Sequence, residues 1–334
     1  MMRLVQLQSG PLRRVAVVEE PNLRLLAASM PSVYALARAA LARGETLETA
    51  VQRHRTGQFV NYDRIYHGEG DWLLLASIDH PDDPAHCLVS GTGLTHLGSA
   101  QNRDAMHTEA KKVETDSMRM FRWGLEGGKP PAGQVGVAPE WFYKGGGTIL
   151  RAPGAALEVP AYAESGGEEG EIAGVYVIAS DGQPWRIGMC IGNEFSDHRF
   201  ERRNYLNLAG SKIRTCALGP ELVIDAPFQS VAGRVTIERA GRSLWSQAIL
   251  TGEAEMCHSL ANIEHHHFKY GTHRQPGDVH VHYYGACSLS SGAGITLADG
   301  DIMTIAYTGF GRPLRNPVRV LPGPEPLVTT KILQ

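Results

Sequence analysis

The sequence lacks several features that mark common classes of protein. Its 334 residues include only five cysteines, which are odd in number and widely spread. No two of them form a Cys-x-x-Cys pair; they are Cys87, Cys190, Cys216, Cys257 and Cys287. This usage favours a reduced, cytoplasmic protein.

Long apolar runs and a surplus of basic charge are also absent. No run approaches the roughly 18 apolar residues needed to cross a membrane, and residues 1–20 contain no continuous apolar segment typical of a signal peptide. The net charge of −3 and a pI near 6.5 argue against nucleic-acid binding, which usually needs a basic surface. We therefore expect neither a membrane nor a nucleic acid as a partner.

Glycine and proline are plentiful, and with 43% hydrophobic residues they favour a turn-rich fold with a sizeable core. Short strands are predicted over 3–8, 14–19 and 23–26, followed by helices over 32–44 and 46–55. Ser32 is a candidate N-cap of the first helix, and Gly44 is its stop. These elements predict a small N-terminal α/β domain over 1–75. Residues 76–334 read mostly as strands and loops, with one helix-compatible segment over 108–128, which gives an α+β protein that is predominantly β.

Carboxylates crowd the start of a segment that reads as a buried strand, "GGEEGEIAGVYVI" (166–178). Glu169 and Glu171 are two residues apart, so in a strand they share a face and lie about 6.6 Å apart along it. Glu194 ends the next strand-like segment, where a returning neighbour would bring it close. Taken alone, Glu169 and Glu171 are better read as two solvated charges, but three carboxylates together suit a hard cation, Mg²⁺ or Mn²⁺. We expect Glu168 to be a bystander on the opposite face.

Several segments in consistent order resemble the fumarylacetoacetate hydrolase superfamily over roughly residues 75–325. They are "PEWFYKGGGTIL", "GEEGEIAGVYVI", "GNEFSDHRFE", "GSK", "ALGPELV", "GDVHVHYYGA" and "LADGDIMTIAYTGFGRPLRNPV". The resemblance implies a mixed β-sandwich roll, usually a homodimer, with a metal held by Glu169, Glu171 and Glu194. Glu194 stands where the family usually has an Asp.

The same resemblance implies roles for other side chains. Lys212 matches the family lysine, whose ammonium can bind a carboxylate or keto oxygen of the substrate. His96 matches the family's entry to the active site, where it is either a base or substrate contact or a loop histidine without a catalytic role. The further predicted substrate contacts are Tyr284 (nearest to a family Thr), Asn193, Ser196 and Lys144.

The patterns "NEFSDHRFE" and "GFGRPLRNP" resemble a bacterial subgroup linked to sugar-acid catabolism, similar to 2-keto-3-deoxypentonate dehydratases. This predicts a metal-dependent dehydratase that converts 2-keto-3-deoxypentonate, a small 2-oxo sugar acid, to 2,5-dioxopentanoate. The metal would stabilise an enolate, with Glu171, Lys212 and His96 in the catalytic set. One alternative is an acylpyruvate C–C hydrolase, which needs a positioned water and a base, often a His–Glu pair. We see no His-x-x-Glu beside His96. A second alternative is a non-catalytic relative that binds a sugar acid.

Three consecutive histidines, His265, His266 and His267, are the most conspicuous metal-like pattern. On a helix neighbouring residues turn by about 100°, so three adjacent imidazoles cannot converge on one ion. In a strand His265 and His267 could face the same way, but no third ligand is indicated. We therefore do not expect a metal there.

Overall fold

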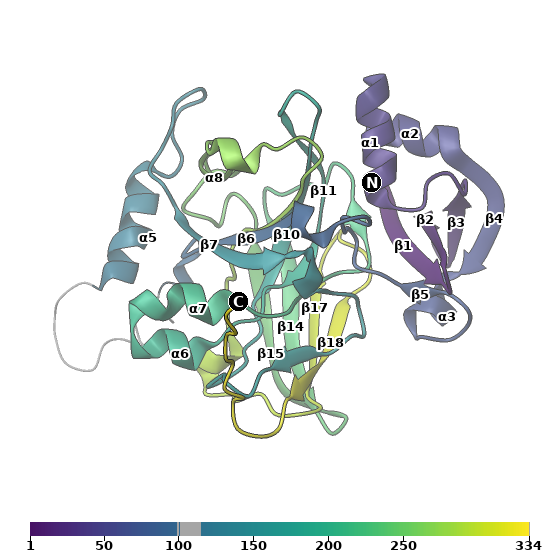
Figure 1. Cartoon of the computed structure of the whole chain (residues 1–334). Coiled ribbons are helices and arrows are strands. Elements are labelled where there is room, and N and C mark those ends of the chain that lie inside the picture. Colours follow the sequence, from purple (N-terminus) through teal and green to yellow (C-terminus); the bar gives the residue numbers. More distant parts are fainter. Residues whose placement is uncertain (99, 101–114, 334) are drawn as a thin grey trace.

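The computed structural model describes residues 1–98, 100 and 115–333 (Figure 1). Its α-helices are α1 (Val33–Arg43), α2 (Leu47–His54), α3 (Tyr62–Tyr66), α5 (Asp116–Gly127), α6 (His198–Arg203), α7 (Leu208–Lys212) and α8 (Leu260–Phe268). The strands up to the middle of the chain are β1 (Arg3–Ser9), β2 (Leu12–Glu19), β3 (Asn22–Leu26), β4 (Arg55–Asn61), β5 (Leu73–Leu74), β6 (Cys87–Gly93), β7 (Glu140–Gly146), β8 (Leu150–Arg151) and β9 (Leu157–Val159). The later strands are β10 (Gly170–Ile178), β11 (Pro184–Asn193), β12 (Cys216–Leu218), β13 (Leu222–Val223), β14 (Val231–Arg239), β15 (Arg242–Thr251), β16 (Val279–Tyr283), β17 (Ile302–Tyr307) and β18 (Leu314–Val320).

Strand β10 lies at the centre of a large mixed sheet. The order along that sheet is β4-β3-β2-β1-β13-β11-β10-β16-β6-β7. All nine residues of β10 are buried, as its β-branched and aromatic composition predicts for an interior strand. It pairs antiparallel with both β11 and β16, while β16 and β6 run parallel.

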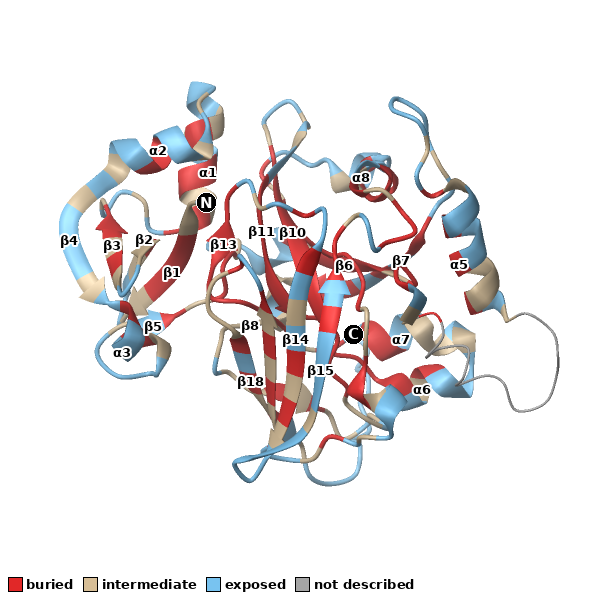
Figure 2. Ribbon diagram, turned by 180° about the vertical axis from the view of Figure 1, so that it is seen from behind, coloured by how far each residue is buried: buried red, intermediate tan, exposed pale blue. Residues whose placement is uncertain are grey.

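A second sheet, of order β15-β14-β17-β18-β9, packs against the first (Figure 2). Their shared core joins Ile172 of β10 and Met189 of β11 to Val235 of β14 and Ile305 of β17. Burial between the two layers therefore holds one face of β10, while residues of α8 such as Phe268 pack on Tyr176 farther along it, with ring centroids 5.0 Å apart. This firm packing fixes where the carboxylates at the start of β10 can lie.

The N-terminal elements form where the sequence predicts them. The Ser32 hydroxyl accepts from the Ala35 amide at 3.0 Å and caps α1, and Gly44 ends that helix in the left-handed region at φ 63°. The predicted helix over 46–55 is α2, and the three predicted strands are β1, β2 and β3.

Residues 1–75 are joined to the rest of the chain through the sheet and a buried acid. Strand β1 pairs with β13, so the large sheet continues without a break across residue 75. The buried Glu221 carboxylate accepts from Arg3 Nη1 at 2.8 Å and from the Tyr62 hydroxyl at 2.9 Å. The proposed boundary near residue 75 therefore separates chain segments that share hydrogen bonds, and it stays a prediction.

The helix-compatible segment over 108–128 contains α5, whose N-cap is Thr115. The part of that prediction over 108–114 lies outside the described residues. Among the described residues, no helix is both long and apolar enough to cross a membrane.

Candidate active site

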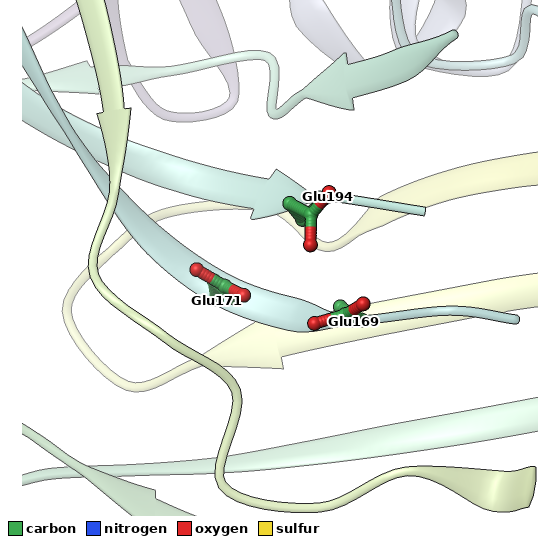
Figure 3. A group of neighbouring side chains, drawn as sticks. All are labelled: Glu169, Glu171 and Glu194. Carbon is green, nitrogen blue, oxygen red and sulfur yellow. The ribbon is translucent and has the colours of Figure 1, made fainter. Parts of the chain in front are cut away.

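The three predicted carboxylates meet where β10 begins and β11 ends (Figure 3). The antiparallel register pairs Gly170 with Asn193, and the Glu194 amide donates to the Glu169 carbonyl at 3.0 Å. One oxygen from each of Glu169, Glu171 and Glu194 lies within 4.8 Å of the others, and all three residues are buried. The three carboxylates thus converge as the sequence predicts, and Glu169 and Glu171 are buried, which excludes the reading of two solvated charges.

The electrostatics of the trio are uneven. Burial alone would raise the pKa of Glu169, but the Lys212 ammonium and then His198 hold it well below its usual range. Burial, followed by the charges of Glu194 and Glu169, raises the pKa of Glu171 well above its usual range. The Gly285 amide donates to Glu171 Oε2 at 2.7 Å.

This amide contact depends on a glycine. Gly285 has φ 104°, and a Cβ there would lie 2.0 Å from Thr95 Oγ1. A side chain at this position would strain the backbone and displace Thr95, so the amide that supports Glu171 could not keep its place.

Lys212, which the resemblance implies to be a substrate contact, lies at the end of α7 against the trio. Its Nζ donates to Glu169 Oε1 and to Glu194 Oε2, both at 2.6 Å, and to the Ser196 hydroxyl at 3.0 Å. The ammonium also lies 4.6 Å from the ring centroid of Phe142. Ser196 in turn donates to Glu194, so the predicted residues Lys212 and Ser196 belong to one buried hydrogen-bond network.

Lys144 is predicted to contact the substrate, but in the structure its ammonium contacts only protein acceptors among its described contacts. It is fully buried, and its ammonium donates to Glu194 Oε1, to the Phe195 carbonyl at 3.1 Å and to the Lys212 carbonyl at 2.8 Å. An ammonium has three protons to donate. Because three protein acceptors take them, Lys144 is placed to fix Glu194 and the backbone that carries Lys212.

Asn193 also turns into the protein, where its Oδ1 accepts from the Glu169 amide at 3.1 Å. Tyr284 lies on the far face of β10: its hydroxyl is 2.5 Å from that of Tyr176, and a Cβ on Gly174 would lie 1.9 Å from it. Gly174 is three residues from Glu171, so it faces the other way. Asn193 and Tyr284 were expected to contact the substrate, but their side chains contact other protein groups and support the backbone around the site.

His96 lies apart from the carboxylates. Its Nδ1 and Nε2 contact the hydroxyls of Thr95 and Thr251 at 2.9 and 3.0 Å, and burial lowers its pKa to about 4. It lines a separate cavity of about 300 Å³, together with Cys287. This position does not match the predicted base at the entry to the site.

A cavity adjoins the trio and contains residues that the sequence analysis did not single out. Its lining consists of Gly93, Leu94, Phe142, Glu169, Glu171, His198, Glu201, Gly285, Ala286 and Leu289. His198 Nε2 lies 3.1 Å from Glu169 Oε1. A local signal existed: Asp197 caps α6 through the Phe200 amide, which places His198 in the first turn, just after the loop that carries Glu194.

The donor set suits a hard divalent cation. It offers carboxylate oxygens from three side chains, without a sulfur or imidazole among them, which is the ligand type that Mg²⁺ and Mn²⁺ prefer. Within the described ranges, no other group of three acidic, histidine or cysteine side chains converges in this way.

The three consecutive histidines do not converge. His265 is exposed, whereas His267 Nε2 lies 2.9 Å from His280 Nδ1, and its Nδ1 accepts from Trp141 Nε1 at 3.1 Å. His282 completes this buried group, with its ring centroid 4.5 Å from that of His267. The group is a network of neutral imidazoles that supports β16.

Acid should therefore destabilise the fold before the carboxylates titrate. Burial, then repulsion from neighbouring imidazoles, lowers the pKa of His280 and His282 to about 3, while an unfolded histidine has a pKa of about 6.5. Their contribution is complete above pH 6.5 and is lost as the pH falls toward 3, by up to about 1.4 kcal/mol per pH unit for each histidine. We expect Tm to fall from pH 7 to 5 and His282→Asn to flatten that slope; an unchanged Tm over this range would contradict the prediction.

The fold matches solved structures along nearly the whole chain. A 2-keto-3-deoxy-D-arabinonate dehydratase complexed with magnesium and 2,5-dioxopentanoate superposes with a TM-score of 0.70 at 20% identity, covering 96% of this chain and 99% of that one. A 5-carboxymethyl-2-hydroxymuconate delta-isomerase from Mycobacterium smegmatis gives 0.57 at 19% identity, over 96% and 100% of the two chains. A 2-hydroxyhepta-2,4-diene-1,7-dioate isomerase from Mycobacterium marinum gives 0.57 at 19% identity, over 96% and 99%.

These likenesses confirm the predicted fold class: the chain has the mixed α/β, fumarylacetoacetate-hydrolase-type fold that its sequence resembles. No protein-family model matches the sequence, and no curated protein matches it either.

Proposed function

We propose that the chain is a member of the fumarylacetoacetate hydrolase superfamily and a magnesium-dependent dehydratase. Its substrate would be a 2-keto-3-deoxy sugar acid, with 2-keto-3-deoxypentonate converted to 2,5-dioxopentanoate. The observation that carries this proposal is the buried trio Glu169, Glu171 and Glu194 with the Lys212 ammonium against it. Such a site combines a place for a hard cation with a fixed positive charge for an anionic substrate.

The roles of the residues follow from their geometry. Glu169, Glu171 and Glu194 would hold Mg²⁺, which when bound supplies a Lewis acid that polarises a keto oxygen. Lys212 Nζ donates to Glu169, Glu194 and Ser196; a cation held by these carboxylates would take over their oxygens and leave a proton of the ammonium for the carboxylate or keto oxygen of a 2-oxo acid. Ser196 and Lys144 keep Glu194 and Lys212 in place, and the Gly285 amide orients Glu171.

One observation favours dehydration over isomerisation, and a second favours it over C–C hydrolysis. The TM-score is 0.70 for the dehydratase complex and 0.57 for the two isomerases, at nearly equal identity. His96, the candidate base for activating a water, contacts two threonine hydroxyls and lines a different cavity from the carboxylates. A purely binding relative would not need a buried ammonium beside three carboxylates, because burying such charges is costly.

The proposal predicts metal-dependent formation of 2,5-dioxopentanoate. Purified protein with Mg²⁺ is offered 2-keto-3-deoxypentonate and an acylpyruvate side by side, and products are followed by NMR. We expect 2,5-dioxopentanoate alone, abolished by EDTA and by Glu171→Gln, which keeps the size of the side chain but removes a charged ligand. The matched control, Glu48→Gln on the exposed face of α2, should behave as wild type.

If pyruvate forms from the acylpyruvate and no 2,5-dioxopentanoate forms, the dehydratase proposal is wrong and the chain is a C–C hydrolase. If neither substrate is converted but a sugar acid binds, the chain is a non-catalytic binding protein.

A further inference from the structure

Glu168, directly before the first metal-ligand candidate, is not the bystander that its place in the sequence suggests. It is fully buried, and its two carboxylate oxygens accept from the Ser290 amide and from the Ser290 hydroxyl, both at 2.7 Å. A buried carboxylate is costly unless hydrogen bonds compensate it. The pair of bonds therefore fixes the short helical segment Ser290–Ala293 against the start of β10.

The next serine connects the same segment to the next glutamate. Ser291 Oγ lies 3.0 Å from His198 Nδ1, and His198 Nε2 lies 3.1 Å from Glu169 Oε1. Since a carboxylate only accepts hydrogen bonds, Nε2 carries the proton and donates to Glu169. Two consecutive serines thus hold two consecutive glutamates, one directly and one through an imidazole.

Glu168, Glu169, His198 and Ser290 are buried, and Ser291 is half-buried. His198 is 7% exposed and lines the cavity beside Glu169. Ala286 and Leu289, which lead into the segment Ser290–Ala293, line the same cavity. The residues that lead into the segment therefore form part of the wall of the proposed substrate site, and the segment itself supports a proposed metal ligand.

We infer that His198 is a positioning residue for Glu169, held by Ser291, and that it sets the metal affinity of the trio. The inference rests on the metal site of the proposed function, but not on which reaction follows. A hydrogen bond from outside the ligand set fixes the orientation of a ligating carboxylate, and removal of such a partner typically weakens metal binding about 10–100-fold. The Ser290–Glu168 bonds keep Ser291 in reach of His198.

The test measures Mn²⁺ binding by titration calorimetry and by electron paramagnetic resonance, without substrate. We expect His198→Ala to weaken Mn²⁺ binding about 10–100-fold. His198→Gln should restore much of the affinity, because the Gln amide can place a donor where Nε2 stood. Ser291→Ala should give an intermediate loss. The matched control is His265→Ala, an exposed histidine of α8, which should bind Mn²⁺ as wild type does.

Thermal melts of the same variants separate positioning from folding, and the glutamine variant provides a second route if the alanine variant does not fold. Mn²⁺ affinity that is weakened in His198→Ala and largely recovered in His198→Gln, with similar Tm for the two variants, supports the positioning role. Wild-type Mn²⁺ affinity in His198→Ala would overturn this inference while leaving the metal site intact. Absence of Mn²⁺ binding by the wild-type protein would instead overturn the metal site, and the inference with it.

Discussion

Lys212→Met should lower kcat/KM for the proposed dehydration on the order of 1000-fold, the upper range for loss of one preorganised donor at a site of developing charge. The substitution keeps an unbranched chain of similar length but removes the ammonium that contacts Glu169 and Glu194 at 2.6 Å. Steady-state kinetics with Mg²⁺ measure the effect. The control is Lys269→Met, at an exposed lysine that follows α8, which should retain wild-type kinetics.

The same variant separates the role of Lys212 from that of the carboxylates. Removing a positive charge beside three carboxylates makes the electrostatic potential at the trio more negative, so Mn²⁺ should bind Lys212→Met at least as tightly as it binds wild type. Glu171→Gln should lose both binding and turnover. A Lys212→Met variant with more than a tenth of wild-type kcat/KM would contradict a substrate-binding ammonium.

The parts of the site that the sequence predicts best are those determined by local spacing. Glu169 and Glu171 share a face because strand residues alternate, and a returning strand brings Glu194 beside them. Ser32 and Gly44 likewise mark the ends of α1 because their capping chemistry is local.

The sequence predicts less well where a side chain points when no local rule determines its direction. Tyr283, paired with Ala173, lies on the Glu171 face of the sheet, whereas Tyr284 lies on the other, so a shift of one residue in matching a motif reverses the expected contact. Lys144 illustrates a second cause. Its partners, Phe195 and Lys212, are more than fifty residues away along the chain, and only the folded backbone brings their carbonyls to its ammonium.

Asp197→Ala, which removes a buried carboxylate, should cause the largest loss of stability among these variants. The Asp197 carboxylate accepts four hydrogen bonds, from Arg214 Nη2 at 3.0 Å, the Ser165 hydroxyl at 2.8 Å, and the Glu164 and Phe200 amides at 2.9 and 3.1 Å. Asp197→Ala leaves the Arg214 guanidinium buried without this carboxylate, and breaking such a pair costs about 3–5 kcal/mol. Urea unfolding should show this loss as a lower midpoint.

A double variant tests whether the uncompensated charge is the cause. Asp197→Ala with Arg214→Met removes both charges, so it should be more stable than Asp197→Ala alone, although the first turn of α6 still lacks its cap. If the double variant is no more stable than the single one, the lost cap and backbone contacts explain the effect, and the ion pair does not. The effect should also reach the site, because the Asp197 amide donates to the Ser211 carbonyl at 3.0 Å, between the loop that carries Glu194 and the helix that carries Lys212. If that contact loosens, the backbone no longer holds the Glu194 carboxylate opposite the Lys212 ammonium inside the protein. We therefore expect activity to fall in both variants.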